Sequence, residues 1–201
     1  GFTFDASGAC VAIPGQDRVP PSVGVRSYPL VERHGYCWIW MGVASAADAT
    51  RIPDFSRNTD PNWTTVHDRL PIAAHYQLMV ENLIDLSHLA FVHAKTIGTD
   101  DTRTVLRFDR GDDFVRVLRE PIEVDTAPHN LKQGMGPRCR LEKTINFTPP
   151  SQVVIDIRTT EVAVQKNDPI SLGITVLNAC TPETLSSTHY FWASARDYQR
   201  V

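Results

Sequence analysis

The stretch ENLIDLSHLAFVH, residues 81–93, decides how the middle of this chain folds. It continues a pattern of apolar residues at helical spacing that begins at Tyr76, and neither Gly nor Pro interrupts it before Gly98. The pattern predicts a helix over residues 76–93. Four polar side chains share one region of that helix: Asn82, Asp85, His88 and His93. Because a buried polar group needs a partner, these four either satisfy one another in a core or hold a ligand.

Two interpretations of the histidine pair stay open. Neutral imidazole is a good ligand for iron, zinc or copper, and Asp85 falls between His88 and His93 on a helical wheel, where it could accept a hydrogen bond from the N–H of a ligating ring. The two histidines are about 140° apart on an ideal helix, so the helix must bend, loosen or end near His93 for both rings to reach one ion. In the second interpretation each is a core histidine with one hydrogen bond. The five remaining histidines are expected to be structural or solvent-exposed: His34, His67, His75, His129 and His189.

Composition excludes several classes of function. The chain has 201 residues, 42% of them hydrophobic and 21% charged, which is ordinary for a globular protein. A net charge of -3 does not suit a nucleic-acid surface, and no apolar run is long enough to span a membrane. The four cysteines lie far apart, which favours free thiols in a reducing compartment. We expect a soluble cytoplasmic protein: its free thiols would be Cys10, Cys37, Cys139 and Cys180.

Residues 1–45 have the pattern of short strands and turns. FTFDASGACVAIP and RSYPLVERHGYCWIWMG each place a turn between two apolar runs, which predicts two hairpins, the second with His34-Gly35 as its turn. Residues 44–72 are polar and contain three prolines, and we interpret them as a connecting region. The predicted domains are therefore 1–45 and 46–201.

The second domain is predicted to be α+β. Strand-like runs at 152–164, 170–180 and 187–198, with short connections, predict an antiparallel sheet on which the single helix packs. Residues 126–140, with two Pro and two Gly, are predicted to form a mobile loop or lid. A pocket is expected between the helix and the inner face of the sheet. Asn178 is a candidate to line it, and the alternative for this residue is a solvated strand end.

The residues of the opening stretch then reveal a family. Asn82, Asp85, His88 and His93 complete the pattern N/D-x-x-D-x-x-H-x-x-x-x-H, which resembles the mononuclear-iron motif of Rieske non-heme iron oxygenases. Four further segments resemble the vanillate O-demethylase and dicamba monooxygenase branch: GFTFDASGACVAIPGQ, YPLVERHGYCWIWMG, TPPSQVVIDI and TPETLSSTHYFWASARDY. The resemblance covers nearly the whole chain.

The resemblance implies a role for each motif residue. His88 and His93 would be two ligands of Fe(II), and a third, carboxylate ligand would lie beyond Val201. Asp85 would bridge from His88 to a cluster-ligating histidine of a neighbouring subunit, as the electron-transfer route in a homotrimer. Asn82 would lie close to the iron without binding it.

The resemblance also implies the domain identities. Residues 1–45 would be the C-terminal part of a Rieske domain whose [2Fe–2S] ligands are not in this chain. Residues 46–201 would be a catalytic domain, incomplete at its C-terminal end, in which an antiparallel sheet grips one long helix (a helix-grip fold of the Bet v1/START type). The chain holds no cluster ligands and only two obvious iron ligands, so either the native protein is longer or this is a fragment without activity. We expect the longer protein, because an end in mid-domain would expose unpaired sheet edges and core surface.

The implied function is that of an oxygenase component. It would use O₂ to hydroxylate or O-demethylate a small aromatic compound, with electrons from a flavin/iron–sulfur reductase or a ferredoxin. The alternative is a metal-free helix-grip domain that binds an apolar ligand, with both histidines buried. A zinc hydrolase is the weakest alternative, because the sequence contains no H-E-x-x-H motif.

Overall fold

A computed structural model describes residues 1–162 and 169–199, and the chain divides into two compact units, Gly1–Ile52 and Pro53–Val201. The first unit consists of two antiparallel hairpins followed by two 3₁₀ turns. Its elements are β1 (Thr3–Phe4), β2 (Cys10–Ala12), β3 (Leu30–Arg33), β4 (Tyr36–Ile39), η1 (Ala44–Ala46) and η2 (Ala49–Arg51). His34 and Gly35 connect β3 to β4 with φ angles of 56° and 78°, the backbone that a two-residue hairpin turn requires. Both predicted hairpins are confirmed, and the identity of this unit as part of a Rieske domain stays a prediction.

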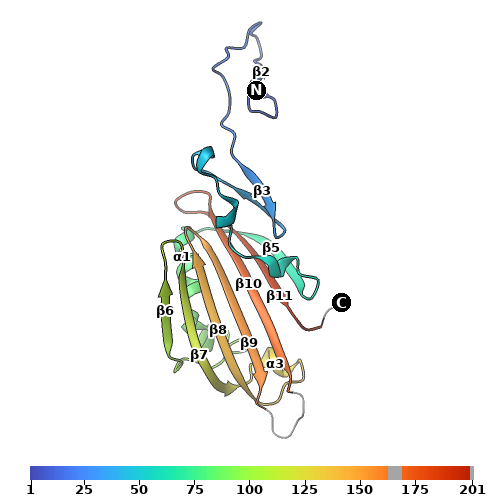
Figure 1. The fold of residues 1–201 in the computed structure, drawn as a ribbon, viewed down its shortest axis with the longest axis vertical. Helices are drawn as coiled ribbons and strands as arrows, with labels where there is room; N and C mark the ends of the chain where they lie inside the picture. Colours follow the sequence, from blue (N-terminus) through green and yellow to red (C-terminus); the bar gives the residue numbers. More distant parts are fainter. Residues whose placement is uncertain (163–168, 200–201) are drawn as a thin grey trace. The chain divides into compact units, whose positions relative to one another are not determined.

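A seven-stranded antiparallel sheet forms the body of the second unit (Figure 1). Its spatial order is β5-β11-β10-β9-β8-β7-β6, so every neighbouring pair except β5 and β11 is also consecutive in sequence. The strands are β5 (Thr64–Ile72), β6 (Leu106–Arg110), β7 (Val115–Asp125), β8 (Arg138–Thr148), β9 (Gln152–Glu161), β10 (Ser171–Pro182) and β11 (Thr188–Arg196). The predicted antiparallel sheet is confirmed. The last two residues of the predicted run 152–164 lie outside the described residues.

Helix α1 (Tyr76–Ile84) covers one face of this sheet (Figure 1). Side chains alternate along β8, so Leu141 and Ile145 point to the same buried face, while Glu142 is exposed on the other face. The core under the helix combines buried residues of the helical segment with buried residues of four strands, β7 to β10: Val80, Leu86, Leu89, Val117, Ile145, Val153, Ile155 and Cys180. Burial of this apolar surface fixes the helical segment against the sheet.

The prediction that residues 44–72 form a connecting region is partly wrong, because the end of this region forms strand β5. This strand is at the edge of the sheet, pairs only with β11, and is mostly exposed, so its sequence lacks an apolar alternation. Pro71 lies within it, and an edge strand is the part of a sheet that tolerates proline. The rest of the region contains three 3₁₀ turns, which are η1, η2 and η3 (Ser56–Asn58).

The prediction of a single helix over residues 76–93 is also wrong. Three elements replace it: α1, the 3₁₀ turn η4 (Leu86–His88) and the short helix α2 (Leu89–Val92). The predicted mobile loop 126–140 contains a one-turn helix, α3 (Pro128–Leu131), and the first residues of β8. Thr126, Ala127 and Met135 of this segment are buried, so its side chains pack into the unit.

The cysteines Cys10, Cys37, Cys139 and Cys180 are all free thiols, as predicted. Among the helices of the described residues, none has the length and apolar character needed to cross a membrane.

Candidate metal centre and adjoining cavity

The helical segment breaks at Asp85. Its amide N–H still donates to the carbonyl of Glu81, but its ψ of 97° is extended and ends α1. Its carboxylate then accepts a hydrogen bond from the backbone N–H of Ser87 at 2.9 Å, which caps the turn that follows. Aspartate competes with helix continuation in this way because its short side chain reaches backbone N–H groups two residues ahead.

The break and the end of α2 bring the two histidines together. The ring centroids of His88 and His93 are 5.6 Å apart, with the rings inclined at 64°. Helix α2 ends at His93, which has φ −110° and ψ 16°. An ending near His93 is one of the conditions that the sequence set for both rings to approach one point. Both side chains are half-buried.

A hydrogen bond fixes the tautomer of His88. Its Nδ1 lies 2.7 Å from the carbonyl oxygen of Asp85. Because a carbonyl oxygen only accepts, Nδ1 carries the proton, and Nε2 of the neutral ring keeps its lone pair. This is the arrangement in which a histidine is prepared to bind a metal, since the second ring nitrogen is held by an acceptor of the protein.

Asp85 and Asn82 are exposed, not buried with the apolar residues of the segment. Hydrogen bonds from the hydroxyl and backbone N–H of Ser87 lower the pKa of the Asp85 carboxyl, and the charges of His88 and Arg119 add to this effect. The carboxylate is therefore available at the surface in its charged form. Within residues 1–162 and 169–199, no group of three His, Cys, Asp or Glu side chains is placed to hold a metal ion. The described part of the chain thus offers the two histidines and no third ligand.

Asn178 is completely buried, so the alternative of a solvated strand end is wrong. Its amide nitrogen donates to the carbonyl of Val153 at 2.9 Å and to that of Val176 at 3.3 Å, and its Oδ1 accepts from the hydroxyl of Tyr190 at 2.7 Å. Asn178 does not border the cavity described next. Its role in substrate binding stays a prediction.

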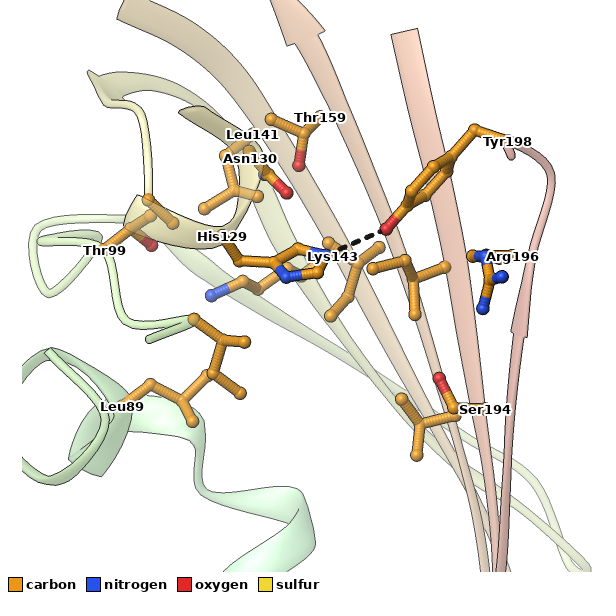
Figure 2. Close-up of a pocket in the computed structure, with 15 residues that line it drawn as sticks. Leu89, Thr99, His129, Asn130, Leu141, Lys143, Thr159, Ser194, Arg196 and Tyr198 are labelled. Atoms are coloured by element: carbon orange, nitrogen blue, oxygen red, sulfur yellow. Dashed lines mark hydrogen bonds between the residues drawn. The ribbon is translucent and has the colours of Figure 1, made fainter. Parts of the chain in front are cut away.

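A cavity of about 300 Å³ lies between the helical segment, segment 126–140 and the sheet (Figure 2). Leu89, the residue after His88, forms part of its wall. The other apolar lining residues are Ile97, Ala127, Leu141, Ile157, Ile174 and Val176. The polar lining residues are Thr99, His129, Asn130, Lys143, Thr159, Ser194, Arg196 and Tyr198. The lining therefore offers both aliphatic surface and hydrogen-bonding groups, the combination that small-molecule sites use for binding and orientation.

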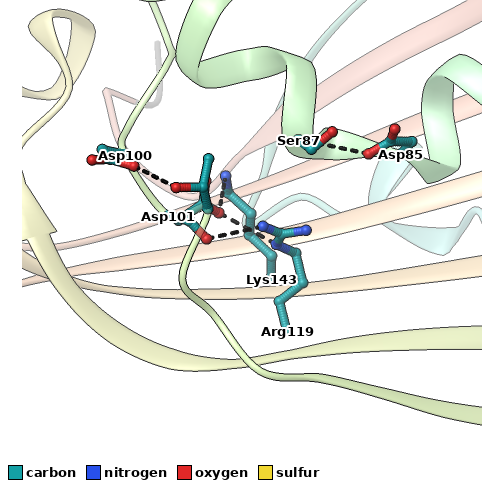
Figure 3. Close-up of polar contacts among 7 residues, drawn as sticks. Asp85, Ser87, Asp100, Asp101, Arg119 and Lys143 are labelled. Atoms are coloured by element: carbon teal, nitrogen blue, oxygen red, sulfur yellow. Dashed lines mark hydrogen bonds and ion pairs between the residues drawn. The ribbon is translucent and has the colours of Figure 1, made fainter.

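Two polar features of the cavity were missed by the sequence interpretation. His129, expected to be structural or exposed, lines the cavity and its Nε2 lies 3.1 Å from the hydroxyl of Tyr198 (Figure 2). Lys143 lines the cavity too, and its Nζ is 2.9 Å from Oδ2 of Asp101, a carboxylate that also lies 3.3 Å from Nε of Arg119 (Figure 3). Burial lowers the pKa of the Lys143 ammonium, and the charge of Asp101 counteracts that effect.

A signal for Lys143 was present in the sequence. In RCRLEKTIN, residues 138–146, alternation from Cys139 through Leu141 to Ile145 places this lysine on the apolar face of a strand. The contact between His129 and Tyr198 had no comparable signal in the sequence, because the two residues are 69 positions apart and no local pattern connects them.

Comparison with known proteins gives one family. Residues 72–201 match the family described as the vanillate O-demethylase oxygenase C-terminal domain. A relative from Comamonas testosteroni, named a putative toluene-4-sulfonate monooxygenase system iron-sulfur subunit, is 34% identical over 98% of this chain and 60% of its own length.

Solved structures give the same result. The crystal structure of dicamba monooxygenase bound to 3,6-dichlorosalicylic acid is 30% identical, with a TM-score of 0.84 over 99% of this chain and 59% of that chain. A structure of dicamba monooxygenase with non-heme iron and dicamba has a TM-score of 0.76 at 29% identity, covering 100% of this chain and 57% of that one. The chain thus spans about three-fifths of the length of these relatives.

Proposed function

The chain belongs to the family of vanillate O-demethylase oxygenase C-terminal domains, and from this premise we propose that it is the larger part of the oxygenase component of a Rieske-type monooxygenase or O-demethylase. The proposed reaction is the hydroxylation or O-demethylation of a small aromatic compound with O₂ at mononuclear Fe(II). The relatives' names support this class of reaction, since they include a monooxygenase iron-sulfur subunit and an iron-containing dicamba monooxygenase.

The observation that carries the proposal is the prepared histidine pair. His88 and His93 have ring centroids 5.6 Å apart, and because Nδ1 of His88 donates to the Asp85 carbonyl, Nε2 is the nitrogen through which the neutral ring could bind a metal. Imidazole nitrogens suit ferrous iron, and two histidines with a carboxylate form the facial site of non-heme iron oxygenases. We propose that the carboxylate and the [2Fe–2S] cluster ligands belong to parts of the protein outside this chain.

The remaining roles follow from the positions of the side chains. Fe(II), when bound, would supply the activation of O₂ that side chains alone do not provide. Asp85 would hold His88 through its backbone carbonyl, while its exposed carboxylate would face the electron donor, a cluster histidine of a neighbouring subunit in a homotrimer. Asn82, also exposed and one turn earlier, would lie at the rim of the same site. A reductase or ferredoxin would deliver the electrons.

The cavity beside Leu89 would orient the substrate. Its aliphatic walls would hold an aromatic ring and exclude water, and its polar side chains would select the ring's substituents. Neither histidine of the pair lines the cavity, but Leu89 of its wall directly follows His88, and we propose that a ring held in the cavity is within reach of the iron site.

The test is metal analysis of the intact protein purified without oxygen. We expect about three iron atoms per subunit, two in a Rieske cluster with its visible absorption and one at the histidine pair. His88→Ala and His93→Ala should each remove about one iron atom and leave the cluster absorption unchanged. His67→Ala is the matched control, because His67 is an exposed histidine of β5. Unchanged iron content in both site variants would contradict the proposed metal site.

The same cavity supports a second candidate function. Seven of its lining residues are apolar, which also suits a metal-free domain that binds an apolar ligand. Iron content separates the two, since such a domain would contain no iron after anaerobic reconstitution with ferrous salt.

A further inference from the structure

The two histidines of the proposed iron site are held in different ways. Nδ1 of His88 donates to the carbonyl of Asp85 at 2.7 Å, which orients that ring directly. The ring nitrogens of His93 make no hydrogen bond within residues 1–162 and 169–199. A metal-binding histidine is usually oriented by a hydrogen bond of its second ring nitrogen. The position of the His93 ring therefore depends on the backbone that carries it.

The backbone after His93 folds back onto the His93 carbonyl. That oxygen accepts hydrogen bonds from the N–H groups of Thr96 and Gly98, each at 2.9 Å, and from the hydroxyl of Thr96 at 3.2 Å. Residues 94–97 form an exposed turn. Because a turn with little buried surface opens easily, its position must be fixed by the residues on either side of it.

A buried carboxylate fixes the far side of this turn (Figure 3). Asp101 is 2% exposed, and its Oδ2 lies 2.9 Å from Nζ of Lys143 and 3.3 Å from Nε of Arg119. Its backbone carbonyl also accepts from Nη2 of Arg119 at 3.1 Å. The side chain and the backbone of Asp101 are therefore both held in the cluster of Asp101, Arg119 and Lys143.

The cluster fastens the segment 93–101 to the interior of the sheet. Arg119 of β7 and Lys143 of β8 are direct register partners on strands that have a neighbour on each side, and their side chains are 7% and 4% exposed. Like charges directly opposite each other in a sheet are destabilising, and burial adds a desolvation cost for each. The carboxylate of Asp101 is thus required beside both cations, and this requirement fixes the place of Asp101 on the sheet.

A second contact holds the turn itself. The N–H of His129 in α3 donates to the carbonyl of Thr96 at 3.1 Å. This is one backbone hydrogen bond at an exposed residue, and its loss costs less than the loss of a carboxylate that two buried cations share. Asp101 is therefore the main anchor of the segment that follows His93.

We infer that Asp101 is a positioning residue for the proposed iron ligand His93. Asp101 neither belongs to the histidine pair nor borders the cavity. It acts through the segment 93–101: the cluster holds the far end, and the hydrogen bonds on the His93 carbonyl transmit that restraint to the ligand. As a statement about a metal ligand the inference rests on the proposed function, whereas the restraint on the segment requires no metal.

Two quantities of the intact protein test this role. Its affinity for Fe(II) is measured by anaerobic calorimetry after the mononuclear iron has been removed with a chelator. Hydrogen exchange of the backbone amides of residues 94–101 is measured in the metal-free protein, where it reports local opening. Asp101→Asn should weaken Fe(II) binding about tenfold or more, the usual cost of losing a residue that orients a metal ligand, and should speed exchange in this segment.

The double variant Asp101→Asn/Lys143→Met separates positioning from general stability. Loss of Lys143 relieves the opposed cations, so the double variant should regain part of the stability that Asp101→Asn loses. Its segment still has no carboxylate to hold it, so Fe(II) affinity should stay about tenfold or more below that of the wild type. Lys143→Met alone keeps the contact of Asp101 with Arg119 and should bind Fe(II) nearly as the wild type does. Asp101→Glu, which keeps a carboxylate, should restore part of the affinity.

Asp125→Asn is the matched control. The carboxylate of Asp125 makes an exposed ion pair with its register partner Arg138 at 3.0 Å, and this pair joins the same two strands, β7 and β8. The same chemical change at this position should leave both the Fe(II) affinity and the exchange of residues 94–101 unchanged.

Fe(II) affinity that returns together with stability in the double variant would show that Asp101 only supports the fold, and would overturn the inference. Unchanged exchange of residues 94–101 in both variants that carry Asp101→Asn would overturn it as well. If the wild-type protein binds no Fe(II), the proposed function fails and the inference fails with it. Fe(II) binding of equal strength in the wild type and the double variant refutes the inference alone.

Discussion

The carbonyl oxygen of Asp85 lies 2.7 Å from Nδ1 of His88, while the carboxylate of the same residue caps the next turn through the N–H of Ser87 at 2.9 Å. One residue therefore ends α1, begins η4 and fixes the tautomer of a proposed iron ligand. The backbone carbonyl of Asp85, not its side chain, holds the ring of His88. The side chain of Asp85 can therefore be replaced without loss of the orientation of His88.

Asp85→Asn should keep the mononuclear iron and lose electron transfer. The amide Oδ1 of asparagine can still cap the turn, since asparagine is as good a cap as aspartate. Without the carboxylate, turnover with the reductase should fall by about 10–100-fold, the usual cost of losing a partner around a metal site. Iron content and the rate of reduction are measured together, with the exposed Glu81→Gln as the charge-matched control. Unimpaired turnover in Asp85→Asn would remove the bridging role.

Gly98→Ala should disturb the position of His93. A Cβ at residue 98 would overlap the carbonyl oxygen of Leu89 and lie 2.8 Å from the carbonyl carbon of His93, and both are backbone atoms that cannot rotate away. The backbone N–H of Gly98 also donates to the His93 carbonyl at 2.9 Å. We expect iron affinity to fall roughly tenfold or more, as for other changes that misplace a ligand. Lys95→Ala, an exposed position in the same turn, should bind iron normally. Full iron loading of Gly98→Ala would show that His93 does not depend on this close approach.

The sequence predicted those parts of the fold that local patterns determine. Alternating apolar residues identified the main strands, and the motif selected His88 and His93, whose rings do approach each other. The break at Asp85 was not predicted, because apolar periodicity continues through it and the competing hydrogen bond to Ser87 is invisible to periodicity. The cavity was located only in outline, since its walls come from strands and segments far apart in the chain.

Asp101→Asn should be much more destabilising than Lys143→Met. Removal of this charge leaves Arg119 and Lys143 opposed and buried without the carboxylate that both contact, which should cost about 3–5 kcal/mol of unfolding free energy. Lys143→Met instead leaves a compensated pair, so its cost should be clearly smaller. The double variant should recover part of the loss. Urea unfolding of the three variants gives the comparison, and equal stability of the two single variants would mean that the cluster is not held by charge compensation.

Tyr190→Phe tests what holds Asn178 inside the sheet. Asn178 lies between β9 and β11, completely buried, and its Oδ1 accepts from the Tyr190 hydroxyl at 2.7 Å. The substitution removes the donor and keeps the ring, so a buried amide oxygen loses its partner where water does not reach it. The expected loss is about 1–3 kcal/mol in unfolding free energy, because an unsatisfied buried acceptor bears its full desolvation cost.

The control for this measurement is Tyr76→Phe. Tyr76 packs against the same core, and its hydroxyl makes no hydrogen bond within the described ranges, so its loss should change stability by much less. A loss as small in Tyr190→Phe as in the control would mean that Asn178 is satisfied in another way. That result would direct attention to a bound ligand as its partner, whereas the expected result identifies Tyr190 as the group that fixes the orientation of the Asn178 amide.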